Sequence, residues 1–440
     1  MKTMVYNIGQ LATPLGTSAR RGKEMGELRV LSNAAVYAED GIIRAVGSQE
    51  EVLREHPLTE MDCCMDAGQK AVIPGFVDSH THFLFGGYRE QEFLDRIVGT
   101  PYLELLRRGG GIQATVSATR EISREEMKRL GKQRMREMLA QGVTTMEGKS
   151  GYGLDEACEL KMLSVMQELK QESCMDLAVT YLGAHAVPLE YTGRSKEYVR
   201  FLTERMLPMI REQHLAEFCD VFCEDGVFDI EETRTILQAA KRLGFALKLH
   251  ADEIECLGGA ELAAELGATS ADHLLAISDN GIAALAEKHV VATLLPNTAF
   301  CLAKPYAPAR KLIDGGAAVA LASDYNPGSC FSNSIPLMLA LAVIHMHMSM
   351  EEALTALTLN GAAALGHADT IGSIEVGKKA DLLILRYPSY QFLVYHTGVN
   401  QVEHVIKAGR ILEGGKIWAM SLSRRNRCRP AAGAAVLPRR

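Results

Sequence analysis

A short apolar segment rich in β-branched residues, followed by a longer segment with apolar residues at helical spacing, recurs along residues 70–365. Eight such pairs predict an α/β protein built on a closed parallel (β/α)8 barrel of the TIM type, because parallel strands are joined by helices that cross back over the sheet. The predicted strands are Gly75–His82, Gly142–Glu147, Leu177–Gly183, Cys219–Glu224, Phe245–His250, Thr269–His273, Val290–Leu295 and Val319–Asp324.

The two ends of the chain instead show short apolar segments separated by glycine turns, as in GSIEVGKKADLLIL at residues 372–385. Neither end is long enough to form a sheet with a core of its own, so we expect both to combine into one small composite β-sandwich. This predicts a β-sandwich domain over residues 1–72 and 368–418 and a barrel domain over 73–367. Residues 419–440 are predicted to be a disordered basic tail.

Composition and charge narrow the class of partner. The 440 residues include 47 Lys and Arg against 54 Asp and Glu, a net charge of −7, which argues against nucleic acid or an anionic membrane as a general partner. The longest apolar run, Ile335–Ile344, is about half of what a bilayer crossing requires. The first residues lack the apolar stretch of a secretory signal. We therefore expect a cytoplasmic protein with a small-molecule partner.

His80 and His82 are the most informative polar residues, because residues i and i+2 of a strand project from the same face and can reach one metal ion. A second His-x-His, at His345 and His347, lies in a pattern typical of a helix, where positions i and i+2 diverge. We therefore predict that the second pair serves packing or the surface, and that only the first pair binds metal.

Other polar residues end the predicted strands 5, 6 and 8, and the carboxyl ends of barrel strands converge on one face. His250 ends strand 5, His273 ends strand 6 and Asp324 ends strand 8. His80, His82, His250 and Asp324 would give three nitrogen ligands and one oxygen ligand, with room for water, as in catalytic zinc sites. We expect one divalent or trivalent metal ion, with zinc preferred over iron.

Several ordered motifs show that the chain resembles the metal-dependent amidohydrolase superfamily and, within it, the imidazolonepropionase family. The resemblance spans roughly residues 1–418. The motifs that carry it are VIPGFVDSHTH at residues 72–82, HFLFGGYRE at 82–90, GGGI at 109–112, EGKSGYGL at 147–154, TYLGAHAVP at 180–188, HADE at 250–253 and SDYNPGS at 323–329.

The resemblance implies hydrolysis of the ring amide of 4-imidazolone-5-propanoate to N-formimino-L-glutamate, a step of histidine degradation. A metal-activated water would be the nucleophile. Asp324 would accept its proton, His273 would orient the water or polarise the ring carbonyl, and Glu253 would shuttle a proton and bind the ring N–H. Lys149 fits the family motif, so we expect it to be unmodified rather than carbamylated between two metals.

The substrate is a small anion, so its propanoate needs a cationic contact. Arg89 is suited to a bidentate grip on a carboxylate. Tyr152 and His185 resemble further substrate contacts of the family. Asn326, Gly328 and Ser329 follow Asp324 in a Pro-Gly turn whose backbone can approach a ligand closely. A homodimer is a further expectation.

Two other functions compete with this interpretation. A hydrolytic deaminase of a purine-like ring in the same superfamily would use a similar set of histidines, glutamate and aspartate, but a carboxylate clamp at Arg89 has no purpose for a neutral purine. A non-catalytic scaffold is the other alternative, against which the intact set of predicted ligands argues.

Overall fold

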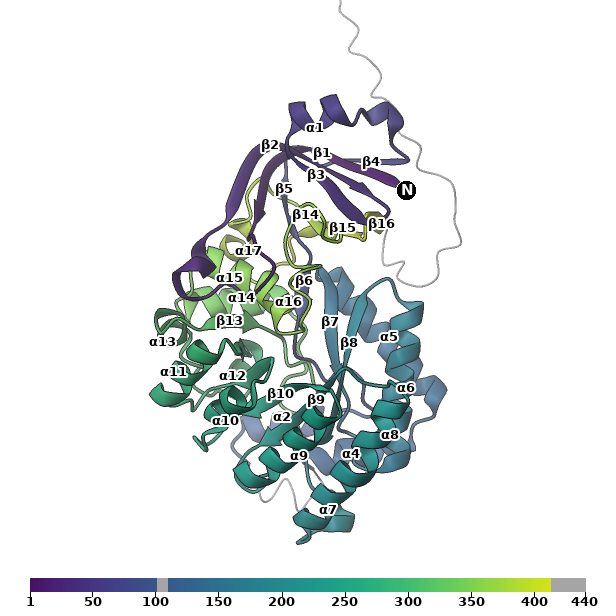
Figure 1. Cartoon of the computed structure of the whole chain (residues 1–440), viewed down its shortest axis with the longest axis vertical. Helices are drawn as coiled ribbons and strands as arrows, with labels where there is room; N and C mark the ends of the chain where they lie inside the picture. Colours follow the sequence, from purple (N-terminus) through teal and green to yellow (C-terminus); the bar gives the residue numbers. More distant parts are fainter. Residues whose placement is uncertain (101–109, 413–440) are drawn as a thin grey trace, which may run out of the picture.

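The computed structural model describes residues 1–100 and 110–412, so the predicted basic tail lies outside the described residues. These residues form two bodies that pack against each other end to end, a large one of alternating strands and helices and a small one made of strands (Figure 1). In the part of the chain described, no helix has the length and apolar character needed to cross a membrane.

The large body is a parallel barrel. Its eight strands follow one another around the barrel in chain order, and every paired neighbour is parallel. This confirms the predicted fold class. The strands are β6 (Phe76–Asp78), β7 (Val143–Lys149), β8 (Asp176–Ala184), β9 (Phe218–Cys223), β10 (Ala246–Ala251), β11 (Ser270–His273), β12 (Val291–Leu294) and β13 (Ala318–Leu321).

The barrel closes beyond the ends of its first and last strands. β6 ends at Asp78, so His80 and His82 lie after the strand. The prediction that they lie on the strand is wrong. An isolated parallel bridge pairs Thr81 with Tyr325. Beside it, the Asp324 N–H donates to His80 O (3.0 Å) and the His82 N–H donates to Tyr325 O (3.0 Å). The seam of the barrel is therefore also the place where the His-x-His motif meets Asp324.

Helices cover the outside of the barrel strands and turn their apolar residues inward. In α9 (Ile230–Arg242), Ile236, Leu237 and Ala240 are buried, and Asp229 caps the helix in a capping box with Glu232. The other helices of this body are α2 (Glu90–Ile97), α4 (Ile112–Glu121), α5 (Arg124–Ala140), α6 (Glu156–Glu172), α7 (Ser195–Phe201), α8 (Leu207–Glu212), α10 (Gly259–Leu266), α11 (Asp279–Lys288), α12 (Pro296–Cys301), α13 (Ala309–Asp314), α14 (Ile335–Ile344), α15 (Met350–Ala356) and α16 (Leu359–Ala363).

The second His-x-His lies between two helices. α14 ends at Ile344 and α15 begins at Met350, so the single helical pattern predicted through this region is wrong. Ser349 caps α15 and breaks the pattern. His345 and His347 are both exposed, and His345 stacks on Tyr306. This placement agrees with a surface role for the pair.

The small body is one mixed sheet built from both ends of the chain. β14 lies next to β5, and this joins the C-terminal strands to the N-terminal ones. Val36, Val72, Ile384 and Ile406 share one buried core, so the two ends complete each other as predicted. The residue limits given above for the two domains stay a prediction. The strands are β1 (Lys2–Thr13), β2 (Arg29–Glu39), β3 (Ile42–Ser48), β4 (Cys63–Asp66), β5 (Ala71–Pro74), β14 (Leu382–Leu385), β15 (Val402–Lys407) and β16 (Arg410–Leu412), with short helices α1 (Gln49–Glu55) and α17 (Phe392–Tyr395).

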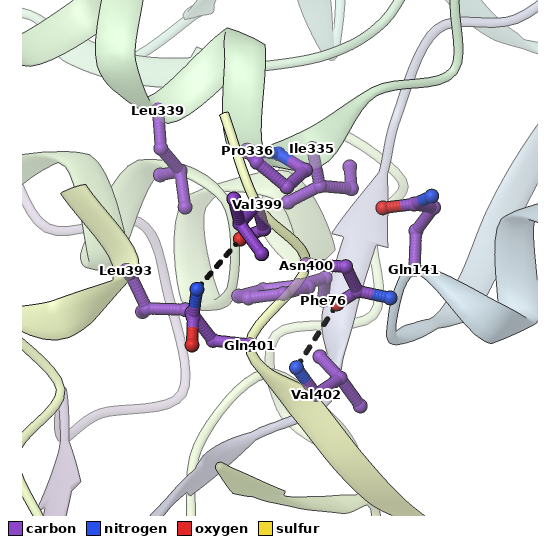
Figure 2. Close-up of a pocket in the computed structure, with 10 residues that line it drawn as sticks. All are labelled: Phe76, Gln141, Ile335, Pro336, Leu339, Leu393, Val399, Asn400, Gln401 and Val402. Carbon is purple, nitrogen blue, oxygen red and sulfur yellow. Dashed lines mark hydrogen bonds between the residues drawn. The ribbon is translucent and has the colours of Figure 1, made fainter. Parts of the chain in front are cut away.

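Residues 399–402, which lead into β15, pack closely against the end of the barrel where Phe76 lies. Phe76 of β6, Pro336 of α14 and the segment 399–402 surround a gap of about 10 Å³, shown in Figure 2. The segment is fixed by its own hydrogen bonds, from Gln401 Nε2 to Val399 O and from the Val402 N–H to Asn400 Oδ1 (both 2.9 Å). The gap holds one water molecule at most and lies at the opposite end of the barrel from His80, so we assign it no ligand.

A buried ion-pair network joins the two bodies. Lys407 of β15 donates to Asp381 Oδ2 (2.6 Å) and to Asp176 Oδ2 of the barrel strand β8 (2.7 Å). The side chains of Lys407 and Asp381 are 2% and 4% exposed. Burial alone would lower the pKa of Lys407, but the two carboxylates raise it and keep it charged. Lys379 donates to the same Asp176 oxygen (2.8 Å) from a half-exposed position.

We predict that Lys407→Met lowers the free energy of unfolding by about 3 kcal/mol, because it leaves a buried carboxylate without its partner. Lys379→Met, at the exposed end of the same network, is expected to cost less than about 1 kcal/mol. Urea unfolding followed by circular dichroism measures both. Equal losses in the two variants would show that burial of Lys407 is not the source of its contribution.

Candidate metal centre and active site

The barrel brings the four predicted metal ligands into one buried cluster, in which His80 and His82 face Asp324 and His250 lies next to His82. Asp324 Oδ1 lies 3.6 Å from His80 Nε2 and 3.6 Å from His82 Nε2. His250 Nε2 lies 3.3 Å from His82 Nε2. All four residues are at most 2% exposed. A tetrahedral zinc with bonds of about 2.0–2.1 Å separates its ligand atoms by about 3.3–3.4 Å, so these donors already stand at the spacing of a metal site.

The hydrogen bonds of the histidines also fit a bound metal. His80 Nδ1 bonds to Asp272 Oδ2 (2.7 Å), while the buried His80 Nε2, which faces Asp324, has no hydrogen-bond partner. A histidine that ligates with one nitrogen and bonds a carboxylate with the other is the usual arrangement around metals. Three groups among the described residues could hold an ion, and all contain His80: one with His82 and Asp324, one with His250 and His273, and one with Glu147 and Asp272.

The surroundings keep these imidazoles neutral, as metal ligation requires. Burial lowers the pKa of His80, His82 and His250 well below the ordinary value. The positive charge of Lys149 lowers the pKa of each further. Burial also raises the pKa of Asp324 to about 7, against hydrogen bonds from Thr298 and Asn326 that lower it. A carboxylate in this position is stabilised by a nearby cation.

Beneath the histidines lies a cluster of five charged side chains with no exposed area. Lys149 donates to Asp220 Oδ2 (2.6 Å) and lies 3.0 Å from Glu147 Oε2 and 3.6 Å from Asp272 Oδ2. Lys248 lies 3.5 Å from Glu147 Oε1 and 3.7 Å from Asp272 Oδ2. We call these five residues the buried charge cluster.

The buried charge cluster touches the metal ligands directly. Asp272 bonds to His80, as described, and Asp220 Oδ2 lies 3.0 Å from His250 Nδ1, although that pair is not aligned as a hydrogen bond. Two lysines against three carboxylates leave one negative charge, and Asp324 adds a second. A divalent cation would balance both, so the charge of the site also fits a metal.

Two predicted catalytic residues lie beside the ligands. His273 Nδ1 and Glu253 Oε1 are 3.5 Å apart. Burial lowers the pKa of His273 to about 4, so its imidazole is neutral. Burial, with the nearby Asp324 and Glu224, raises the pKa of Glu253 to about 8, so this carboxyl carries a proton at neutral pH.

The backbone is unusual at the same strand ends. His273 has φ 78° and Asp324 has φ 49°, in the left-handed region that residues with side chains seldom adopt. Asp252 (φ 49°) accepts from the N–H groups of Leu257, Gly258, Gly259 and Ala260, at 3.0–3.1 Å, and so shapes the loop that carries Glu253.

The predicted substrate contacts differ in their position relative to this centre. The rings of His185 and Tyr152 lie 4.9 and 5.9 Å from that of His82. Arg89 lines a cavity of about 490 Å³ together with Gly328 and Phe331, and no predicted metal ligand is among its described lining residues. Its guanidinium is bound to Glu92, a partner that sequence analysis did not identify.

Asn326 is committed to its own turn. Its Oδ1 accepts from the N–H groups of Gly328 and Ser329 (both 2.8 Å), and its Nδ2 donates to Asp324 O (2.7 Å) and Ser329 Oγ (2.8 Å). It therefore holds the turn in shape, and its side chain occupies the N–H groups of Gly328 and Ser329.

Sequence analysis did not assign roles to Asp220, Asp272 and Thr298. Thr298 donates to Asp324 Oδ2 (2.7 Å) and so fixes that carboxylate. For the two aspartates a signal was present, because a charged residue inside an apolar strand is buried only with a partner. The sequence alone did not show which partner it would be.

Comparisons with known proteins identify the family of the chain. The model of the amidohydrolase family matches residues 71–412. An imidazolonepropionase of Clostridium tetani is 57% identical over 409 residues, 93% of this chain and 97% of that protein. One of Parabacteroides distasonis is 56% identical over 411 residues, covering 93% and 98%.

Solved structures share the fold at lower identity. An adenosine deaminase of Xanthomonas campestris with bound zinc aligns with a TM-score of 0.68 at 21% identity, covering 93% of this chain and 92% of that one. A Xaa-Pro dipeptidase aligns with a TM-score of 0.67 at 17% identity, covering 94% and 100%. With more than half of its residues identical to those relatives over nearly its whole length, the chain belongs to the imidazolonepropionase family of the amidohydrolases.

Proposed function

We propose that the protein hydrolyses the ring amide of 4-imidazolone-5-propanoate to N-formimino-L-glutamate, in histidine degradation. The observation that carries this proposal is the buried cluster of His80, His82, His250 and Asp324, in which Asp324 lies 3.6 Å from His80 and His82, and His250 lies 3.3 Å from His82. Family membership favours this reaction over deamination of a purine-like ring and over a non-catalytic scaffold.

His80, His82, His250 and Asp324 would hold one metal ion. When bound, such an ion lowers the pKa of water and supplies a nucleophile at neutral pH. We propose zinc before iron, since three imidazoles and one carboxylate suit a borderline divalent cation. Asp272 would fix the ring of His80 through Nδ1, and Asp220 lies where it would support His250. Lys149 donates to Asp220 and lies 3.6 Å from Asp272, and it needs no modification for this role.

The chain's own residues would then move the protons. Asp324 would accept a proton from the water that adds to the ring carbonyl carbon. His273, neutral and next to the ligands, would donate an N–H to the carbonyl oxygen as negative charge develops on it. As the ring C–N bond breaks, the leaving nitrogen needs a proton, and Glu253 carries one at neutral pH.

Arg89 would bind the propanoate, and Tyr152 and His185 would border the ring near His82. The turn at Gly328 and Ser329 would close the far side of the substrate. A cytoplasmic location and a homodimer remain proposals that gel filtration with light scattering and cell fractionation would test.

Incubation of the pure protein with imidazolone propanoate tests the proposed reaction. We expect the ultraviolet absorbance of the substrate to fall while formiminoglutamate appears in equal amount. Guanine and adenosine serve as comparison substrates and should release no ammonia. Release of ammonia from a purine, without turnover of imidazolone propanoate, would favour the deaminase alternative instead.

His80→Ala is expected to lower metal affinity by more than about 100-fold and to abolish turnover, since loss of a supporting residue alone costs 10–100-fold. His347→Ala removes a histidine from the exposed His-x-His and is the matched control, expected to bind metal as the natural protein does. Metal content measured by mass spectrometry decides the matter. Stoichiometric metal in His80→Ala would exclude His80 as a ligand.

Arg89→Ala is expected to raise KM for imidazolone propanoate by about 10- to 100-fold, because a hydrogen-bonded charge pair contributes about 1.5–3 kcal/mol. The value of kcat should change much less, since the propanoate is remote from the reacting bond. Steady-state kinetics separate the two effects. An unchanged KM would remove Arg89 from the substrate contacts.

A further inference from the structure

The side chain of Glu92 fixes the guanidinium of Arg89. Arg89 Nε donates to Glu92 Oε2 (3.0 Å), and Arg89 Nη2 donates to Glu92 Oε1. The two side chains are only 13% and 11% exposed, so water competes weakly for them. Burial would raise the pKa of Glu92, but Arg89 and the Gly111 N–H lower it, and the carboxylate stays charged.

A second contact anchors Glu92 itself. The Gly111 N–H donates to Glu92 Oε2 (2.8 Å). Gly111 has φ 80° and precedes α4, a backbone conformation that favours glycine. Glu92 therefore links the start of α2 to the start of α4, and its carboxylate cannot rotate without breaking a contact to a separate segment.

Gly328 limits the opposite edge of the same guanidinium. A Cβ atom on Gly328 would lie 2.3 Å from Arg89 Nη1 and 3.1 Å from Arg89 Cζ. Any larger residue would therefore displace the guanidinium. Arg96 of α2 also donates to Gly328 O (3.3 Å), which holds the turn against the helix.

The free donors of Arg89 define where a second carboxylate can bind. A guanidinium has five N–H donors in a planar fork. Among the described residues, Glu92 is the hydrogen-bond partner of the guanidinium and occupies Nε and one N–H of Nη2, which leaves the edge formed by Nη1 and the rest of Nη2. That edge can accept another carboxylate in bidentate geometry while Glu92 stays in place.

We propose that Glu92 and Gly328 are positioning residues that hold the Arg89 guanidinium with its Nη1–Nη2 edge presented to the carboxylate of the substrate. This inference rests on the proposed function. It assigns carboxylate selectivity to a pre-formed unit of three residues rather than to Arg89 alone, and it gives the glycine before α4 a purpose in substrate binding.

A different role for Glu92 predicts a change of KM in the other direction. If Glu92 occupied the place of the substrate carboxylate, substrate would have to displace it, and removing its charge would lower KM. If Glu92 positions Arg89, removing its charge frees the guanidinium to move and raises KM. The sign of the change therefore decides between the two.

Glu92→Gln and Gly328→Ala are expected to raise KM for imidazolone propanoate by about tenfold each, with kcat within about twofold of the natural protein. Glu126→Gln is the matched control. Glu126 holds Arg129 three residues away through the same two contacts (both 2.7 Å), on the exposed surface of α5, and its loss should leave KM unchanged.

A second readout separates positioning from general damage. Imidazole propanoate and its uncharged amide are compared as inhibitors, and both variants should weaken only the acid, by about tenfold. A lower KM in Glu92→Gln, an unchanged KM in either variant, or equal weakening of acid and amide would overturn the inference. Absence of turnover by the natural protein would instead overturn the proposed function, which keeps the two failures apart.

Discussion

Charge balance in a space without water is the constraint on which this site depends. Lys149 and Lys248 stand among three carboxylates inside the barrel, and none of these side chains is exposed. Removing an ion from water costs several kcal/mol even after relaxation, so such a cluster persists only if each charge has partners. Burial keeps the nearby histidines neutral, helped by the positive charge of Lys149, and the cluster leaves the excess negative charge that a divalent cation would compensate.

Closure of the barrel adds a geometric constraint to the electrostatic one. β6 has only three residues, and the first and last strands meet through the bridge of Thr81 with Tyr325. The hydrogen bonds beside that bridge tie the backbone of His80 to that of Asp324. His80 and His82, near the start of the barrel sequence, and Asp324, near its end, are therefore positioned by the same contacts that close the barrel. A distortion of the closure would also move these predicted ligands.

The sequence predicted the architecture because the barrel strands are apolar, short and regularly spaced, and it predicted the proximity of His80, His82, His250 and Asp324 because strand ends converge. It did not predict the features that depend on contacts between residues far apart in the sequence. β6 ends at Asp78 and not at His82 as its pattern predicted, and beyond it the chain makes the isolated bridge of Thr81 with Tyr325. Asp272 and His80 are 192 residues apart, and Lys149 and Asp220 are 71 apart, so no local pattern reveals either pair.

Glu92 shows a different limit of sequence reasoning. Arg89 was predicted as a contact for the substrate carboxylate, with no partner of its own considered, and a carboxylate three residues further along a helix is usually a weak surface pair. Here the pair is largely buried, and Glu92 accepts a further hydrogen bond from the Gly111 N–H. The pair therefore fixes the orientation of the Arg89 guanidinium. The net charge of Arg89 with Glu92 is zero. The Debye length is about 8 Å in physiological salt, so the interaction of the bound substrate with the exposed charges that make up the net charge of −7 is largely screened. Selectivity for an anion must then come from the direction of the remaining N–H donors at short range.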